Sequence, residues 1–128
     1  MKCKITVIED DLDLRTLLHN GLRLEGYSVC TYENGDEFLL SWQEDGPSDL
    51  YVIDINLGGI TGFEICNRIK SKDENGAATV ILISANPEVQ QLARDVSADD
   101  YMLKPFSQRE LFAKITELLQ QRSNNKVA

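Results

Sequence analysis

Five short apolar runs of the chain alternate with five longer stretches in which apolar residues recur at helical spacing. The short runs favour strands and the longer stretches favour amphipathic helices. Consecutive strands separated by helices need right-handed crossovers, which produce a parallel sheet with helices on both faces. We therefore predict an α/β fold with a doubly wound five-stranded parallel sheet, whose strands lie near residues 5–8, 27–32, 50–53, 80–83 and 101–103.

Local sequence signals predict where several helices begin and end. Capping-box spacing at residues 61–64 and 107–110 predicts two helix starts. Residues 86–88 read as an N-cap, a proline at the first helical position and an acidic residue in the first turn. We predict a polar loop at residues 70–76. Residues 122–128 carry no core residues, so we expect a frayed end or the start of a linker there.

Length and charge exclude several classes of protein. The chain has 128 residues, which suits one domain, assigned here to residues 1–121. It carries 13 Lys and Arg against 21 Asp and Glu, a net charge of −8. That charge argues against direct nucleic-acid binding and against attachment to an anionic membrane. No run is long enough for a transmembrane helix and no signal peptide is evident, so we expect a cytoplasmic protein.

The cysteine and histidine content offers little chemistry. Cys3, Cys30 and Cys66 are widely spaced and odd in number, which fits neither a disulfide framework nor a zinc site. We interpret them as small apolar residues in a reducing compartment. His19 is the only histidine and is predicted to lie on a helix surface.

Four of the five predicted strands end in residues with charged or hydrogen-bonding side chains. In a parallel sheet of this kind such residues gather at one edge, where ligands bind. Carboxylates there would repel one another, by on the order of 4 kcal/mol for a pair about 4 Å apart at an effective dielectric near 20. A hard cation such as Mg²⁺ or a lysine would compensate, and a hydroxyl and a lysine together suit a phosphoryl group. The residues are Glu9, Asp10, Asp54, Asn56, Ser84 and Lys104.

A purely structural interpretation exists for each of these residues. Acidic residues that follow a strand often only cap the next helix. The coincidence of four such strand ends in one chain favours a functional site over four independent caps.

Four motifs, at residues 8–11, 52–56, 83–85 and 100–106, together resemble the receiver domain of bacterial two-component response regulators. The resemblance covers residues 3–121. It implies the flavodoxin-like (βα)5 fold of CheY-like proteins. Each motif alone is weakly specific, whereas the ordered set at successive strand ends is strongly so.

The resemblance implies a role for each motif residue. Asp54 would be the phosphoacceptor, phosphorylated by a sensor histidine kinase or a phosphotransfer protein. Mg²⁺ would be bound by the carboxylates of Asp10 and Asp54, by the backbone carbonyl of Asn56, and by Glu9 through water.

The remaining motif residues would respond to the phosphoryl group. Lys104 would pair with a phosphoryl oxygen and Ser84 would hydrogen-bond to it. Tyr101 would be the aromatic switch that turns inward when Ser84 moves, and the Lys104–Pro105 peptide would be cis. The surface around the fourth helix would then bind an unidentified downstream protein or form a phosphorylation-dependent dimer.

The chain departs from the common receiver pattern at several positions. Gly58 stands where many receivers have proline, and Gly58-Gly59 should make that loop more mobile. Thr61 replaces a common aspartate, with its capping role kept. Ser97 replaces a usual glycine, and the predicted fourth helix is short.

Three other functions compete with a signalling module that is not an enzyme. A Mg²⁺-dependent phosphatase with Asp54 as nucleophile needs a general acid two residues on, and Asn56 cannot supply a proton. A phosphorylation-independent interaction domain usually lacks the acceptor, the acid pair or the lysine, all of which are present. A nucleotide-binding flavodoxin-like protein is disfavoured because no glycine-rich loop follows the first strand. The sequence leaves open whether the receiver stands alone or belongs to a longer protein.

Overall fold

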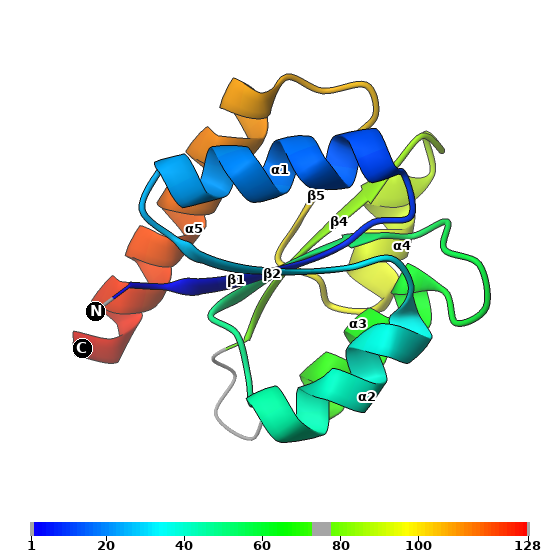
Figure 1. Ribbon diagram of the computed structural model, residues 1–128, viewed down its shortest axis with the longest axis horizontal. Coiled ribbons are helices and arrows are strands. Elements are labelled where there is room, and N and C mark those ends of the chain that lie inside the picture. Colours follow the sequence, from blue (N-terminus) through cyan, green and yellow to red (C-terminus); the bar gives the residue numbers. More distant parts are fainter. Residues whose placement is uncertain (1, 73–77, 128) are drawn as a thin grey trace.

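The computed structural model describes residues 2–72 and 78–127 and contains the five predicted strand and helix pairs (Figure 1). The strands are β1 (Lys4–Ile8), β2 (Ser28–Tyr32), β3 (Leu50–Asp54), β4 (Thr79–Ser84) and β5 (Asp100–Leu103). The helices are α1 (Leu12–Leu24), α2 (Gly35–Asp45), α3 (Gly62–Lys72), α4 (Val89–Asp95) and α5 (Gln108–Val127).

The strands form one parallel sheet in the order β2-β1-β3-β4-β5. Strand β1 therefore lies inside the sheet and β2 lies at one edge. After β2 the chain crosses back over β1 and adds β3, β4 and β5 in turn on the other side. The reversal of direction lies between β1 and β3, which pair with Ile8 opposite Ile53. The predicted doubly wound α/β fold is confirmed.

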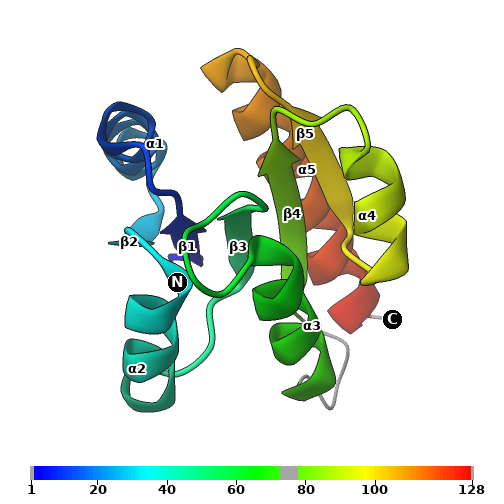
Figure 2. The ribbon, with the colours of Figure 1, turned by 90° about the vertical axis from the view of Figure 1, so that its right-hand side faces the viewer.

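The helices cover the sheet on both faces. Helices α1 and α5 lie on one face (Figure 1), where Leu18, Leu22, Leu111 and Ile115 pack against the strands. Helices α2, α3 and α4 cover the other face, and α4 packs over β4 and β5 (Figure 2). All residues of β3 and β4 are buried, as expected for strands covered on both sides.

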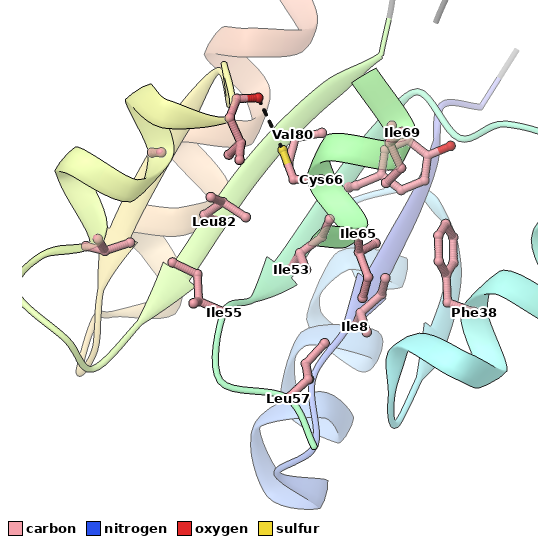
Figure 3. Packing of buried hydrophobic residues seen from close by; sticks show 14 residues of the cluster. Ile8, Phe38, Ile53, Ile55, Leu57, Ile65, Cys66, Ile69, Val80 and Leu82 are labelled. Carbon is pink, nitrogen blue, oxygen red and sulfur yellow. Dashed lines mark hydrogen bonds between the residues drawn. The ribbon is translucent and has the colours of Figure 1, made fainter. Parts of the chain in front are cut away.

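Successive residues of each strand contribute in turn to two cores, one beneath α2, α3 and α4 and the other on the opposite face of the sheet. Ile53 and Leu82 point toward α3, where they meet Ile65 and Cys66 (Figure 3). Their neighbours in sequence point toward α1 and α5 instead, because side chains alternate along a strand. This arrangement fixes which residues emerge at the ends of the strands.

Capping residues begin two helices where the sequence predicts. The Thr61 hydroxyl accepts a hydrogen bond from the Glu64 amide at 3.2 Å, directly before α3. The Ser107 hydroxyl accepts from the Glu110 amide at 3.0 Å, at the start of α5. Residues 70–72 of the predicted polar loop belong instead to α3, which continues to Lys72, and residues 73–76 of that prediction lie outside the described part of the chain.

Two helix ends differ from the prediction. Helix α4 begins at Val89, so Pro87 is not its first residue. The Asn86 side chain instead accepts a hydrogen bond from the Glu88 amide at 2.9 Å, which forms a turn ahead of the helix. Helix α5 does not fray from Arg122 but continues to Val127. The Arg122 guanidinium pairs with Asp49 at 2.6 Å and secures this end of the helix.

The backbone connection between α4 and β5 carries one unusual conformation. Ser97 has a φ of +59°, in the left-handed region that glycine adopts most readily. A glycine at this position would adopt that conformation without the steric cost of a Cβ.

The three cysteines are free, and Cys66 is buried. Burial raises the pKa of the Cys66 thiol to about 11, and its Sγ lies 3.9 Å from the Val96 carbonyl oxygen (Figure 3). His19 lies in α1 and is partly exposed, as predicted. Among the described residues, every helix is too short or too polar to cross a membrane.

Candidate functional site

The ends of β1, β3, β4 and β5 place the predicted site residues at one edge of the sheet. Backbone hydrogen bonds extend the pairing beyond the strands themselves. The Lys104 amide donates to the Ser84 carbonyl at 2.8 Å, and the Ile55 amide donates to the Ile83 carbonyl at 2.9 Å. The loops that follow these strands therefore start from fixed positions.

Asp54 is the last residue of β3 and is only 3% exposed. Its Oδ1 accepts a hydrogen bond from the Asn56 amide at 2.9 Å, and its Oδ2 accepts one from Lys104 Nζ at 2.9 Å. These two contacts fix the orientation of the carboxylate.

Glu9 follows β1 directly and is fully buried. Its Oε2 accepts a hydrogen bond from the Asp11 amide at 3.2 Å, and its Oε1 lies 2.7 Å from Lys104 Nζ. Burial raises the pKa of Glu9 to about 7, with a further contribution from the neighbouring Asp54 carboxyl, and Lys104 opposes this rise. A carboxyl group in this position is easily protonated near neutral pH.

Lys104 follows β5 and pairs with both buried carboxylates. Burial alone would lower the pKa of Lys104, but its close pairing with the Glu9 and Asp54 carboxylates outweighs that effect and raises it. Lys104 also lines an open cavity of about 410 Å³, so the site is reached from solvent. The next peptide bond, Lys104–Pro105, is cis, as the resemblance implies.

Glu9, Asp10 and Asp54 together form an acidic cluster. One carboxylate oxygen of each lies within 4.8 Å of the others, and Asp10 is exposed. Lys104 is the single lysine paired with this cluster in the described part of the chain. Although Glu9 Oε1 lies near that ammonium, it has no hydrogen bond of good geometry there. A buried oxygen short of donors beside two further carboxylates fits a hard cation such as Mg²⁺.

Ser84 and Tyr101 lie on the neighbouring strands. Ser84 ends β4, is fully buried, and accepts a hydrogen bond on Oγ from the Asn86 amide at 3.0 Å. Tyr101 lies in β5 and is partly exposed. Lys114 Nζ lies 5.9 Å from the centre of the Tyr101 ring. Asn56 is exposed, and its amide rather than its side chain contacts Asp54.

Two residues that the sequence analysis did not select also support the site. The Arg15 guanidinium donates to the Glu9 carbonyl at 2.8 Å. Gly62 packs directly on the backbone of Asp54 and Ile55. Arg15 carries no sequence signal beyond its place early in α1. Gly62 follows the capping threonine, which marks a helix start without indicating the close approach of the backbone.

Comparison with protein families gives one clear match. The model of the response regulator receiver domain matches residues 5–116. The PhoB phosphate regulon transcriptional regulatory protein of Rhizobium meliloti is 38% identical over 118 residues, which cover 91% of this chain and 52% of that protein. PrrA, a transcriptional regulatory protein of Mycobacterium tuberculosis, is 32% identical over 94% of this chain and 52% of its own length. The chain thus spans about half the length of these curated relatives.

Solved structures of receivers agree with the fold. The Thermotoga maritima response regulator TrrA, in complex with Mg²⁺ and beryllium fluoride, is 36% identical, and the match has a TM-score of 0.80 and covers 92% of this chain and 99% of that one. The beryllofluoride-activated DrrB receiver domain is 29% identical, and that match has a TM-score of 0.83 and covers 94% of this chain and 99% of that one.

Proposed function

Because the chain belongs to the response regulator receiver domain family, we propose that Asp54 accepts a phosphoryl group from a sensor histidine kinase or a phosphotransfer protein. One observation carries this proposal. The Asp54 carboxylate is held at the sheet edge by Lys104 and the Asn56 amide, beside two further carboxylates. The domain is a signalling module whose own residues assist the transfer.

The proposed transfer is an in-line displacement at phosphorus. An oxygen of Asp54 forms a bond to phosphorus as the bond between phosphorus and the donor imidazole nitrogen breaks. The electron pair of that bond stays on the nitrogen, and a proton on the other ring nitrogen makes the leaving group a neutral imidazole, while Asp54 becomes an acyl phosphate. The Asn56 amide and Lys104 hold the carboxylate in place, and positioning supplies much of the rate in such transfers. The Lys104 ammonium also neutralises charge on the phosphoryl oxygens.

The acidic cluster would hold Mg²⁺ for this reaction. Its ligands would be the carboxylates of Asp10 and Asp54 and the backbone carbonyl of Asn56, with Glu9 acting through water. When bound, Mg²⁺ would neutralise charge on the phosphoryl oxygens.

Phosphorylation of the isolated chain tests the assignment of Asp54. We expect Mg²⁺ with acetyl phosphate or phosphoramidate to add one phosphoryl group, seen in the intact mass. Asp54→Asn should abolish the gain, because an amide oxygen is a poor nucleophile. Asp13→Asn, the same change at an exposed carboxylate in α1, should leave it intact. Equal labelling of Asp54→Asn and the parent chain would place the acceptor elsewhere.

We further propose that Ser84 and Tyr101 transmit the state of Asp54 to the surface formed by α4, β5 and α5. A phosphoryl group offers the Ser84 hydroxyl a charge-assisted hydrogen bond worth about 1.5–3 kcal/mol. That energy shifts a two-state equilibrium by about tenfold to a hundredfold. Tyr101 would turn inward in the shifted population.

A beryllofluoride titration followed by NMR tests this switch. In the parent chain we expect shifts at Tyr101 and at the amides from residue 84 to residue 104. In Ser84→Ala we expect beryllofluoride still to shift the loop after Asp54, with Tyr101 nearly silent. If Tyr101 responds in Ser84→Ala as in the parent chain, the hydroxyl does not couple the two sites.

The output of this receiver is proposed to run through protein contacts. The chain has a net charge of −8, which disfavours direct binding to nucleic acid. Relatives named as transcriptional regulators are about twice as long as the matched region. A downstream protein, another part of the same protein or a second copy of the receiver would then read the altered surface.

A further inference from the structure

Arg15 contacts the backbone of the acid pair at the end of β1. Its Nη1 donates to the Glu9 carbonyl at 2.8 Å and lies 3.4 Å from the Asp10 carbonyl. The Arg15 amide donates to the Asp11 carbonyl at 2.9 Å. One residue of α1 therefore holds three successive carbonyl groups of the loop that carries Glu9 and Asp10.

This contact matters most for Asp10. Glu9 is also held through its side chain, by Lys104 and by the Asp11 amide. The exposed Asp10 carboxylate makes no hydrogen bond or ion pair with the residues that the structure describes. Its position is therefore set by the backbone, which two side chains hold: Arg15 through the Glu9 and Asp10 carbonyls, and Glu9 through the Asp11 amide.

The chemistry of the contact suits a metal site. The guanidinium donates to carbonyl oxygens and makes no ion pair within the described residues, so it does not compete with a cation for the carboxylates. Mg²⁺ demands near-ideal octahedral geometry, which makes its affinity sensitive to ligand placement. Both contacts come from Nη1 of a planar guanidinium, whose N–H groups have fixed directions, whereas a lysine ammonium is carried on a flexible stem.

We infer that Arg15 is a positioning residue for the magnesium site, which it serves by holding the carbonyls of Glu9 and Asp10. This inference rests on the proposed function, because it assumes that the acidic cluster binds Mg²⁺. Loss of groups that orient metal ligands commonly weakens metal affinity by about tenfold to a hundredfold.

Mg²⁺ titrations of the full chain, followed by NMR amide shifts at residues 9–11 and 54–58, test the inference. We expect Arg15→Met to raise the dissociation constant of Mg²⁺ by about tenfold or more. The sign is diagnostic, because removal of a positive charge near a dication would by itself tighten binding. Arg23→Met, the same change at an exposed position near the end of α1, is the matched control and should leave the constant unchanged.

A second variant keeps the test decisive. Arg15→Lys retains the charge on a shorter and more flexible side chain, so its dissociation constant should lie between those of the parent chain and Arg15→Met. Parent-like or tighter binding in Arg15→Met overturns the inference, and so does parent-like binding in Arg15→Lys should the methionine variant fail to fold. Absence of Mg²⁺ binding in the parent chain would instead contradict the proposed metal site.

Discussion

Mg²⁺ should raise the free energy of unfolding of this domain by about 2.7 kcal/mol at a hundredfold excess over its dissociation constant. The reason is the acidic cluster, in which the carboxylates of Glu9, Asp10 and Asp54 face one lysine. Without a cation the folded state bears their mutual repulsion, and a bound dication removes it. Urea unfolding followed by the fluorescence of Trp42, the single tryptophan, measures the difference against sodium chloride of equal ionic strength.

The pH dependence of the metal-free domain follows from Glu9, whose pKa rises from its ordinary 4.5 to about 7 on folding. The folded state binds this proton more tightly than the unfolded chain. The stabilising contribution is therefore fully present below pH 4.5 and is lost as pH rises through about 7. In the metal-free protein, Glu9 should therefore contribute less to the free energy of unfolding at about pH 8 than at about pH 5.5. Mg²⁺ should stabilise the domain more at about pH 8 than at about pH 5.5, because there it does not compete with the Glu9 proton.

The variant Asp10→Ala tests whether Mg²⁺ stabilises the domain by binding at the acidic cluster. The Asp10 side chain is exposed, so its removal leaves no cavity and relieves some repulsion. Metal-free Asp10→Ala should be at least as stable as the parent chain, and its response to Mg²⁺ should disappear. Asp13→Ala, at a nearby exposed position, should keep the full response. If Asp10→Ala gains as much stability from Mg²⁺ as the parent chain, the metal binds elsewhere.

The site residues that could be predicted from the sequence are those that directly follow a short apolar run, because such a run predicts a strand and its end. Asp54 follows Ile53 at the end of a buried strand, and Lys104 directly follows the short strand β5. A parallel sheet then brings such residues together whatever the details of the loops. The alternation of strands and helices predicts the sheet and its two covered faces, because it depends on periodicity alone.

Two kinds of contact could not be predicted from the sequence. One joins residues that are distant in sequence, and the other joins a side chain to a nearby backbone group. The pairing of Arg122 with Asp49 joins residues 73 positions apart and keeps α5 helical where its polar composition indicates fraying. The asparagine before α4 forms a turn instead of a cap, although both use the same side-chain oxygen. The sequence did not indicate Arg15 as a site residue, because a guanidinium that binds backbone carbonyls requires no particular residue type at those positions.

Gly62→Ala should be the most damaging small substitution near the site. The Gly62 amide donates to the Ile55 carbonyl at 3.1 Å, so the first residue of α3 rests on the backbone that follows the acceptor. A Cβ at this position would overlap the Asp54 carbonyl oxygen and lie 2.7 Å from the Asp54 carbonyl carbon. It would also lie 2.8 Å from the Ile55 Cα. None of these obstacles is a side chain that could rotate away.

The expected loss is near the upper end for overpacking, about 3 kcal/mol in the free energy of unfolding. For a domain of this size that corresponds to a fall in Tm of roughly 10 °C. Relief of the clash requires α3 or the Asp54 backbone to move, so phosphorylation of the surviving folded protein should also slow. Thermal unfolding and the rate of mass gain with acetyl phosphate measure the two effects.

Gly58→Ala is the matched control, because it adds the same methyl group four residues earlier, in the loop that leads to α3. A Cβ at Gly58 meets no atom within 4 Å, and its φ lies outside the left-handed region. Alanine has less conformational freedom than glycine in the unfolded chain, so Gly58→Ala should leave the free energy of unfolding unchanged or raise it by about 0.4–1 kcal/mol. Equal stability of the two variants would mean that α3 does not rest on the backbone of residues 54 and 55. A loss confined to Gly62→Ala shows that the position of the acceptor depends on this helix contact as well as on its own hydrogen bonds.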